Sequence, residues 1–183
     1  MKKFLLFLIV AIAAVLFVVP QFLSTSYAMD RSTTINAPAA SIHEVVSDLQ
    51  TWNDWTVWNT EVDPSLKWEY TGEPGAKGHS MSWKSDDLGN GSVTITEVNP
   101  TRIAYDMIFE DDEPAQCAMV LQPTSDDSTE VKWEMGGEMT GPAYERYFGL
   151  LADRLVGPAF EEGLANLKTR VEAGPAPAAA DGE

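Results

Sequence analysis

The side chains that could do chemistry are few and scattered through this 183-residue sequence. Cys117 is the only cysteine, so no intramolecular disulfide and no thiolate zinc site can form. The two histidines, His43 and His79, have no spacing that would supply a base to Cys117 or a second metal ligand one helical turn away. No Gly-rich phosphate loop and no serine nucleophile motif occurs. The residues therefore predict no metal site, no cofactor and no nucleophilic centre.

An acid–base enzyme would need a polar side chain with a shifted pKa inside an apolar pocket. The weak catalytic candidates are Glu97 and Tyr105. Glu97 follows Val93 and Ile95 on one alternating face and could point inward at the end of a strand. Solvent exposure beside the turn at residues 99–100 is the competing orientation, and the rarity of buried unpaired carboxylates favours it.

The charge of the chain is strongly acidic, with a formal net charge of −16. All 28 acidic residues follow Met29, whereas Lys2 and Lys3 precede a hydrophobic segment. Such a surface repels nucleic acid and anionic headgroups, so we expect no nucleic-acid partner. It is typical of a solvated extracytoplasmic domain, and a cationic protein partner is the alternative use of the same charge.

Residues 4–23 are apolar apart from Pro20 and Gln21. Twenty helical residues span about 30 Å, the thickness of the hydrocarbon core of a bilayer. The preceding lysines predict an N-terminus in the cytoplasm and a domain outside the cytoplasmic membrane. The motif Ser26-Tyr27-Ala28 would also suit a signal peptidase, so secretion after cleavage near Ala28 is the alternative. We favour an anchor because the apolar run is longer than a typical signal core.

The pattern after the anchor changes from strand to helix and back to strand. Residues 29–36 predict a strand, and residues 39–49 predict a helix with one apolar face. The tryptophans at 52, 55 and 58 predict a short helix or turn that caps a core, either as an aromatic plug or as a gate at a pocket. Between 66 and 139, six alternating runs separated by turn residues predict an antiparallel meander.

Helical spacing resumes at residues 143–172, and the final residues include no large apolar side chain. The sequence therefore predicts an α+β fold in which a curved antiparallel sheet of about seven strands wraps around a long C-terminal helix. The expected divisions are an N-terminal anchor or signal peptide at 1–28, one folded domain at 29–172 and a disordered tail at 173–183.

Three stretches carry a resemblance to a known family: residues 32–38, the segment Asp48-Leu49 with Trp52-Asn53-Asp54-Trp55, and residues 91–98. The run at 157–167 is similar to the closing helix of the same family. Together they resemble the START-like (SRPBCC) superfamily, specifically its polyketide cyclase/dehydrase and lipid-transport family. This resemblance implies a helix-grip fold with a hydrophobic cavity between sheet and helix, and it supplies no catalytic motif.

The alternating strands and the first turns of the C-terminal helix would direct one set of apolar side chains into such a cavity. The candidate ligand-binding residues are Trp83, Ile95, Tyr105, Met107, Phe109, Met119, Trp133, Met135, Phe148, Leu151 and Leu155. A plain packed core is the alternative use of the same residues.

Three functions follow from this sequence. The first is non-catalytic binding or transport of a hydrophobic small molecule or lipid by a membrane-tethered domain. The second is a cyclase or dehydratase acting in the same cavity, and the third is an interaction module that uses the acidic surface.

Overall fold

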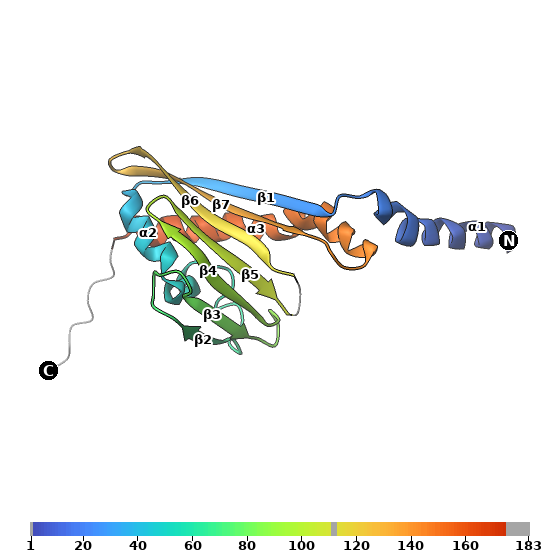
Figure 1. The fold of residues 1–183 in the computed structure, drawn as a ribbon, viewed down its shortest axis with the longest axis horizontal. Helices are drawn as coiled ribbons and strands as arrows, with labels where there is room; N and C mark the ends of the chain where they lie inside the picture. The colour runs from blue at the N-terminus through green and yellow to red at the C-terminus, as the bar shows by residue number, and fades with distance from the viewer. Residues whose placement is uncertain (1, 111–112, 175–183) are drawn as a thin grey trace.

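The computed structural model describes residues 2–110 and 113–174. One curved sheet lies along a long helix, and the N-terminal helix projects from one end of the domain (Figure 1). The sheet contains seven antiparallel strands in the order β1-β7-β6-β5-β4-β3-β2. The predicted fold class is confirmed, because strands β2 to β7 form a meander and β1 pairs with β7 at its far edge.

The strands and helices have these bounds. The strands are β1 (Ser26–Ile35), β2 (Lys67–Thr71), β3 (Ser80–Lys84), β4 (Gly91–Asn99), β5 (Arg102–Phe109), β6 (Ala115–Ser125) and β7 (Ser128–Glu138). The α-helices are α1 (Lys2–Ala13), α2 (Ala39–Ser47) and α3 (Arg146–Glu172). Four short helical segments are the π-helix η1 (Ala14–Val18) and the 3₁₀ segments η2 (Val19–Phe22), η3 (Leu49–Asp54) and η4 (Ala143–Glu145). Of the predicted tail at 173–183, residues 175–183 lie outside the described part.

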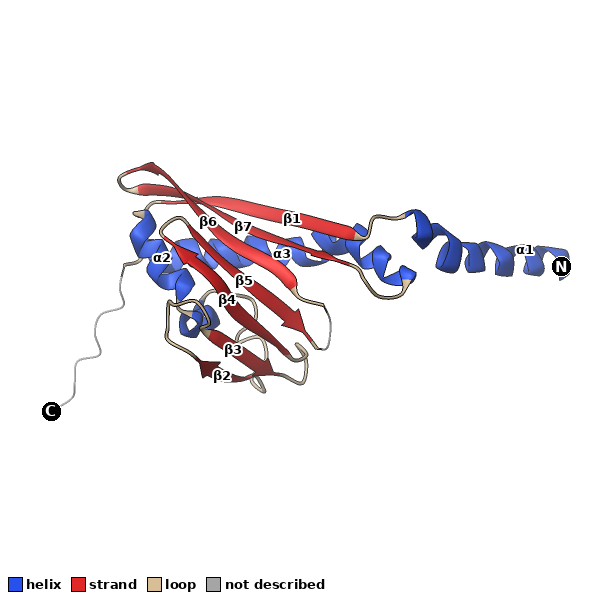
Figure 2. Ribbon diagram, in the orientation of Figure 1, coloured by secondary structure: helices blue, strands red, loops and turns tan. Residues whose placement is uncertain are grey.

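The strands form where apolar and polar residues alternate, because successive side chains point to opposite faces of a sheet. In β7 the inward set Val131, Trp133 and Met135 is buried, while the residues between them are only half-buried. Helices cover the inward face, with α3 along β1 and α2 at one end (Figure 2). The core therefore lies between this face and α3.

Helix α3 is held on β1 by an arginine that points inward. Arg31 donates through Nε to Glu161 at 2.6 Å and through Nη1 to Asp153 at 2.7 Å, so it bridges two positions on the helix. Gly157 lies between these positions, and a Cβ there would be 2.2 Å from the guanidinium. Hydrogen bonds to both carboxylates raise the pKa of Arg31 above its ordinary value, and the pKa of Asp153 is correspondingly lowered. The two ion pairs of Arg31 thus fix the position of α3 on β1.

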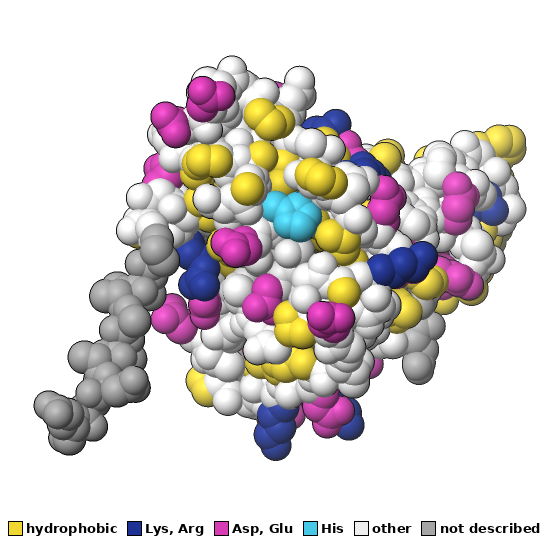
Figure 3. Space-filling model, turned by 60° about the vertical axis from the view of Figure 1, so that its left-hand side comes forward, with side chains coloured by type: hydrophobic (Ala, Val, Ile, Leu, Met, Phe, Trp, Pro, Cys, Tyr) yellow, Lys and Arg dark blue, Asp and Glu magenta, His cyan; other side chains and the backbone are white. Residues whose placement is uncertain are grey.

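On the face shown in Figure 3, acidic side chains alternate with basic and apolar ones and form no single field. Several are paired: Lys168 contacts Glu172 at 2.6 Å, and Lys132 contacts Glu134 at 2.6 Å. Exposed pairs of this kind contribute little to stability.

Asp63 is a buried carboxylate that joins two loops. It accepts hydrogen bonds from the Ser85 hydroxyl, from the Ser65 N–H at 2.8 Å and from the Asp87 N–H at 3.2 Å. These bonds, led by the one from Ser85, hold the pKa of Asp63 well below its usual range. The carboxylate thereby connects the segment before β2 to the turn between β3 and β4.

We expect Asp63→Asn to lower the melting temperature of the full chain in detergent at pH 7, because the amide cannot replace a charged acceptor of three bonds. A depressed pKa stabilises the fold above the unfolded value, near 3.9 for aspartate, and that stabilisation is lost as the pH falls. The difference between wild type and variant should therefore shrink below about pH 4. Circular dichroism melts from pH 7 to pH 3 measure this. Asp126→Asn, in the exposed β6–β7 turn, should follow wild type, and parallel curves for Asp63→Asn would contradict the assignment.

Candidate functional site

Large aromatic side chains fill the middle of the space between sheet and helix. Trp52, Trp55, Tyr105, Trp133 and Phe160 are each at most 1% exposed. Trp133 stacks on Phe160 with a centroid distance of 4.0 Å, and Trp52 contacts Tyr105 edge-on at 5.1 Å. The indole of Trp52 donates to the Val46 carbonyl at 3.1 Å, and that of Trp55 to the Thr51 hydroxyl at 3.4 Å. These two tryptophans form an aromatic plug with satisfied donors, so this part of the interior is packed.

Tyr105 and Cys117 lie within the packed interior. The Tyr105 hydroxyl accepts a hydrogen bond from the Trp133 indole, and burial raises the pKa of Tyr105 well above its ordinary value. Burial likewise raises the pKa of the Cys117 thiol to about 12. Both groups are therefore neutral at physiological pH. Cys117 is a buried thiol, and thiols of this kind are inert.

Glu97 is exposed at the far end of β4. A β-bulge shifts the register between Ile95 and Glu97, so the alternation that keeps Val93 and Ile95 inward does not continue to the carboxylate. Its side chain accepts a hydrogen bond from the Asn99 amide at 2.7 Å. The structure thus places Glu97 on the surface and the Tyr105 side chain in the core.

An open pocket of about 450 Å³ lies at the end of the domain nearest the N-terminal helix. Its walls come from β1, β5, β6, β7 and the first half of α3. Its apolar lining comprises Tyr27, Met107, Phe109, Pro114, Ala115, Met135, Met139, Phe148 and Val156. Tyr27 meets Phe148 edge-on at 5.8 Å, which joins the first strand to the helix across the pocket.

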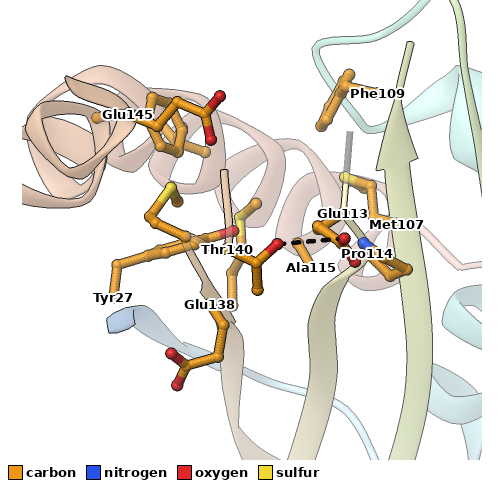
Figure 4. A pocket seen from close by; sticks show the side chains of 13 residues that line it. Tyr27, Met107, Phe109, Glu113, Pro114, Ala115, Glu138, Thr140 and Glu145 are labelled. Atoms are coloured by element: carbon orange, nitrogen blue, oxygen red, sulfur yellow. Dashed lines mark hydrogen bonds between the residues drawn. The ribbon is translucent and has the colours of Figure 1, made fainter. Parts of the chain in front are cut away.

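The polar groups of the pocket are few. They are Glu113, Glu138, Thr140 and Glu145, and among the described lining residues none is basic. The Thr140 hydroxyl donates to Glu113 at 3.2 Å beside Met107 and Ala115 (Figure 4). Among the described residues, no group of three His, Cys, Asp or Glu side chains could hold a metal ion. The lining is therefore mainly apolar, and the charged side chains in it are acidic.

A second hollow, of about 530 Å³, lies on the opposite face of the sheet. Its charged residues include Asp30, Arg102 and Glu134, and Arg102 contacts Glu134 at 3.2 Å. Lys132 contacts the other oxygen of Glu134, which lowers the pKa of that carboxyl. Arg102 and Glu134 are therefore paired within this hollow, whose lining also includes the carboxylates Asp30 and Asp106.

The predicted ligand-binding residues divide into three groups in the structure. Met107, Phe109, Met135 and Phe148 line the open pocket. Trp83, Ile95, Tyr105, Met119 and Trp133 are buried in the packed core.

Leu151 and Leu155 were expected to face the sheet, and this orientation is wrong because they are 45% and 62% exposed. The side of α3 that packs on the sheet instead carries Ala152, Phe160 and Leu164, so the leucine stripe lies to one side of it. Whether any of the candidates contacts a ligand stays a prediction.

Several lining residues were missed in the sequence, above all Tyr27. Strand β1 begins at Ser26, three residues before the expected boundary at Met29. Tyr27 lies two residues before the buried Met29, so alternation along β1 was the signal that could have placed it inward. Ala115, Met139 and Val156 were not among the predicted ligand-binding residues either, although they line the pocket.

Comparison with known proteins identifies the family of this fold. A family model described as polyketide cyclase / dehydrase and lipid transport matches residues 27–172. The chain belongs to this family. The match begins at Tyr27, inside β1, and ends at the last residue of α3. The resemblance inferred from the sequence is therefore confirmed, and the chain has no significant match among curated proteins.

Solved structures share the helix-grip fold of this polyketide cyclase/dehydrase family member. Norcoclaurine synthase from Thalictrum flavum, in complex with dopamine and hydroxybenzaldehyde, is 14% identical, with a TM-score of 0.59 over 87% of this chain and 94% of its own. A protein from Thermobifida fusca is 18% identical, with a TM-score of 0.59 over 80% and 93%. The di-domain ARO/CYC protein BexL of the BE-7585A biosynthetic pathway is 16% identical, with a TM-score of 0.60 over 81% and 48%. At these identities the likeness shows the fold alone.

Proposed function

We propose that this protein binds a hydrophobic small molecule or lipid, without catalysis, while its N-terminal helix tethers it to a membrane. The observation that carries the proposal is the mainly apolar pocket of about 450 Å³, one of whose lining residues, Glu145, belongs to the η4 segment that contacts η1 and η2. Pockets of this size with few polar groups are typical of small-molecule sites. A fold neighbour, norcoclaurine synthase, has been solved with the small aromatic molecules dopamine and hydroxybenzaldehyde, which supports a ligand of this kind.

The positions of the acid–base candidates support binding rather than catalysis. Glu97 is on the surface, and Tyr105 is enclosed by the buried aromatic side chains of the core, including Trp52 and Trp133. A general acid or base must come within hydrogen-bonding reach of its substrate. Neither residue lines the pocket of about 450 Å³, so neither of these candidates supports a cyclase or dehydratase acting there.

The N-terminal segment supports a retained tether. Residues 2–22 form a helix long and apolar enough to cross a membrane, a property that signal sequences share. The Ser26-Tyr27-Ala28 motif lies within β1, paired with residues 136–138 of β7, and Tyr27 lines the pocket. Cleavage after Ala28 would remove three residues of this strand and one wall of the pocket. We therefore propose an uncleaved single-pass anchor, with Lys2 and Lys3 in the cytoplasm and the domain outside.

Photo-crosslinking in lipid nanodiscs tests the binding function with the full chain. The probe is a neutral long-chain alcohol that carries a diazirine, and adducts are mapped by peptide mass spectrometry. We expect saturable adducts on residues 102–109 and 135–148, because these segments supply Met107, Phe109, Met135 and Phe148 to the pocket. An excess of unlabelled alcohol should remove these adducts. Adducts confined to residues 2–22, with the domain unlabelled, would refute the proposed function.

A further inference from the structure

The first half of α3 and the η4 segment before it expose an unusual number of large apolar side chains. Tyr144 is 59% exposed, Leu150 66%, Leu151 45% and Leu155 62%. Helical periodicity places them, together with Tyr147, on the side of α3 that points away from the sheet or borders the pocket. We call this set the leucine face.

The charge of the leucine face differs from that of the rest of the chain. Between residues 143 and 158 this side carries no acidic residue, and its charged residues are Arg154 and, at its edge one turn before Leu150, Arg146, although the chain has 28 acids and 12 bases. Asp153 is turned toward Arg31, and Glu145 faces the pocket. Beyond Pro158 the same side of the helix carries no large apolar residue, and Glu162, the small Ala165 and Thr169 lie there. The apolar surface is therefore confined to the end of α3 near the N-terminal helix.

Direct contacts join the start of α3 to the N-terminal apolar segment. The Arg146 guanidinium donates to the Pro20 carbonyl at 3.0 Å, and the Tyr147 hydroxyl donates to the Val15 carbonyl. Within this segment, about half of Val15 is exposed, and most of Phe17 and Phe22 is exposed. Val15 precedes the end of this segment by seven residues, which is about 10 Å along a helix. The start of α3 thus lies beside the last turns of the anchor, well before its end.

We propose that the leucine face lies in the interfacial layer of the bilayer that the N-terminal helix enters. This inference rests on the proposed tether, because a retained anchor places the bilayer next to residues 144–155. Tyrosines suit the boundary between headgroups and acyl chains, leucines suit the apolar side of it, and Arg154 can extend toward the headgroups. Phe148, which lines the pocket, belongs to the same helical stripe as Leu151 and Leu155, so the pocket opens beside the lipid.

Spin-label accessibility measures where the leucine face lies. Single cysteines are introduced into the full chain at Leu151 and Leu155, with Ala165→Cys on the polar half of α3 as the aqueous control and Leu8→Cys as the anchor control. The native Cys117 is buried, so it should not react with the spin label. Wild-type protein treated with the same label is the control for this. In liposomes of neutral phosphatidylcholine, the labels at 151 and 155 should be relaxed by oxygen and protected from a nickel chelate, as at position 8. The label at 165 should show the reverse.

Each other outcome has a distinct meaning. If position 8 is in lipid but 151 and 155 are as open to nickel as 165, docking of the leucine face is wrong and the tether stands. If position 8 is also aqueous, the tether itself fails. If labels at 151 and 155 are shielded from both reagents, a protein partner or a second copy of the chain covers the face, and the bilayer is not its occupant. Circular dichroism shows whether each variant is folded. Two positions of the leucine face, 151 and 155, are used so that the test still stands if one of them does not tolerate cysteine.

Discussion

Replacing Trp133 with alanine is expected to lower the free energy of unfolding by about 3–5 kcal/mol, which is the usual range for removing a buried tryptophan. Its ring is fully buried and stacks on Phe160 at 4.0 Å. Trp55 contacts the same ring at 5.3 Å, and the Trp133 indole N–H donates to Tyr105. The truncation would open a cavity in the middle of the domain and leave the Tyr105 hydroxyl buried without this donor.

Denaturant unfolding of the full chain, followed by near-UV circular dichroism, measures this loss. Trp133→Phe is the matched variant, because it keeps an aromatic ring against Phe160 and removes the indole donor. Its cost should be smaller, about 1–3 kcal/mol for the unsatisfied partner and the lost volume. If Trp133→Ala costs no more than Trp133→Phe, the ring stack is not the main stabilising contact of this core.

Filling the pocket with Val156→Trp is expected to reduce saturable crosslinking of the diazirine alcohol by about tenfold. Val156 lines the pocket two helical turns after Phe148, so an indole at 156 would occupy the space proposed for the ligand. Forcing a ligand into a filled pocket costs roughly 1–3 kcal/mol, and 1.4 kcal/mol corresponds to a tenfold change in affinity.

The control places the same side chain elsewhere on the same helix. Ala165 is exposed on the polar half of α3, away from the pocket, so Ala165→Trp should crosslink as wild type does. Melting temperatures of both variants separate a filled pocket from a damaged fold. Unchanged, saturable crosslinking in a folded Val156→Trp protein would show that the ligand lies outside this pocket.

Much of the fold could be predicted because its signals are local. Alternation along β5 and β7, the turn residues between strands and the apolar spacing of α3 each depend on neighbours in the sequence. The burial of Trp52 and Trp55 also followed from residue type. The bulge after Ile95 was not predicted, since an extra residue in one strand is decided by the register of its partner.

The site was harder to predict because its position depends on how α3 crosses the sheet. Phe148, Leu151 and Leu155 share one helical stripe, yet only Phe148 lines the pocket. Arg31 and the close approach at Gly157 set the rotation of the helix, and neither has a periodic signal in the sequence. Tyr27 was assigned to the N-terminal anchor or signal peptide at 1–28, because the apolar run and the small residues near Ala28 resemble a processing site.

The connection between the N-terminal helix and the sheet is short: residues 23–25 alone separate η2 from β1. Three residues reach about 10 Å even when fully extended. With the helix in a bilayer, the pocket would therefore stay close to the membrane surface. It could not carry a bound molecule across a wide aqueous gap. A bound molecule would have to enter and leave the pocket from the plane of the membrane, or be transferred there to a partner protein that diffuses freely.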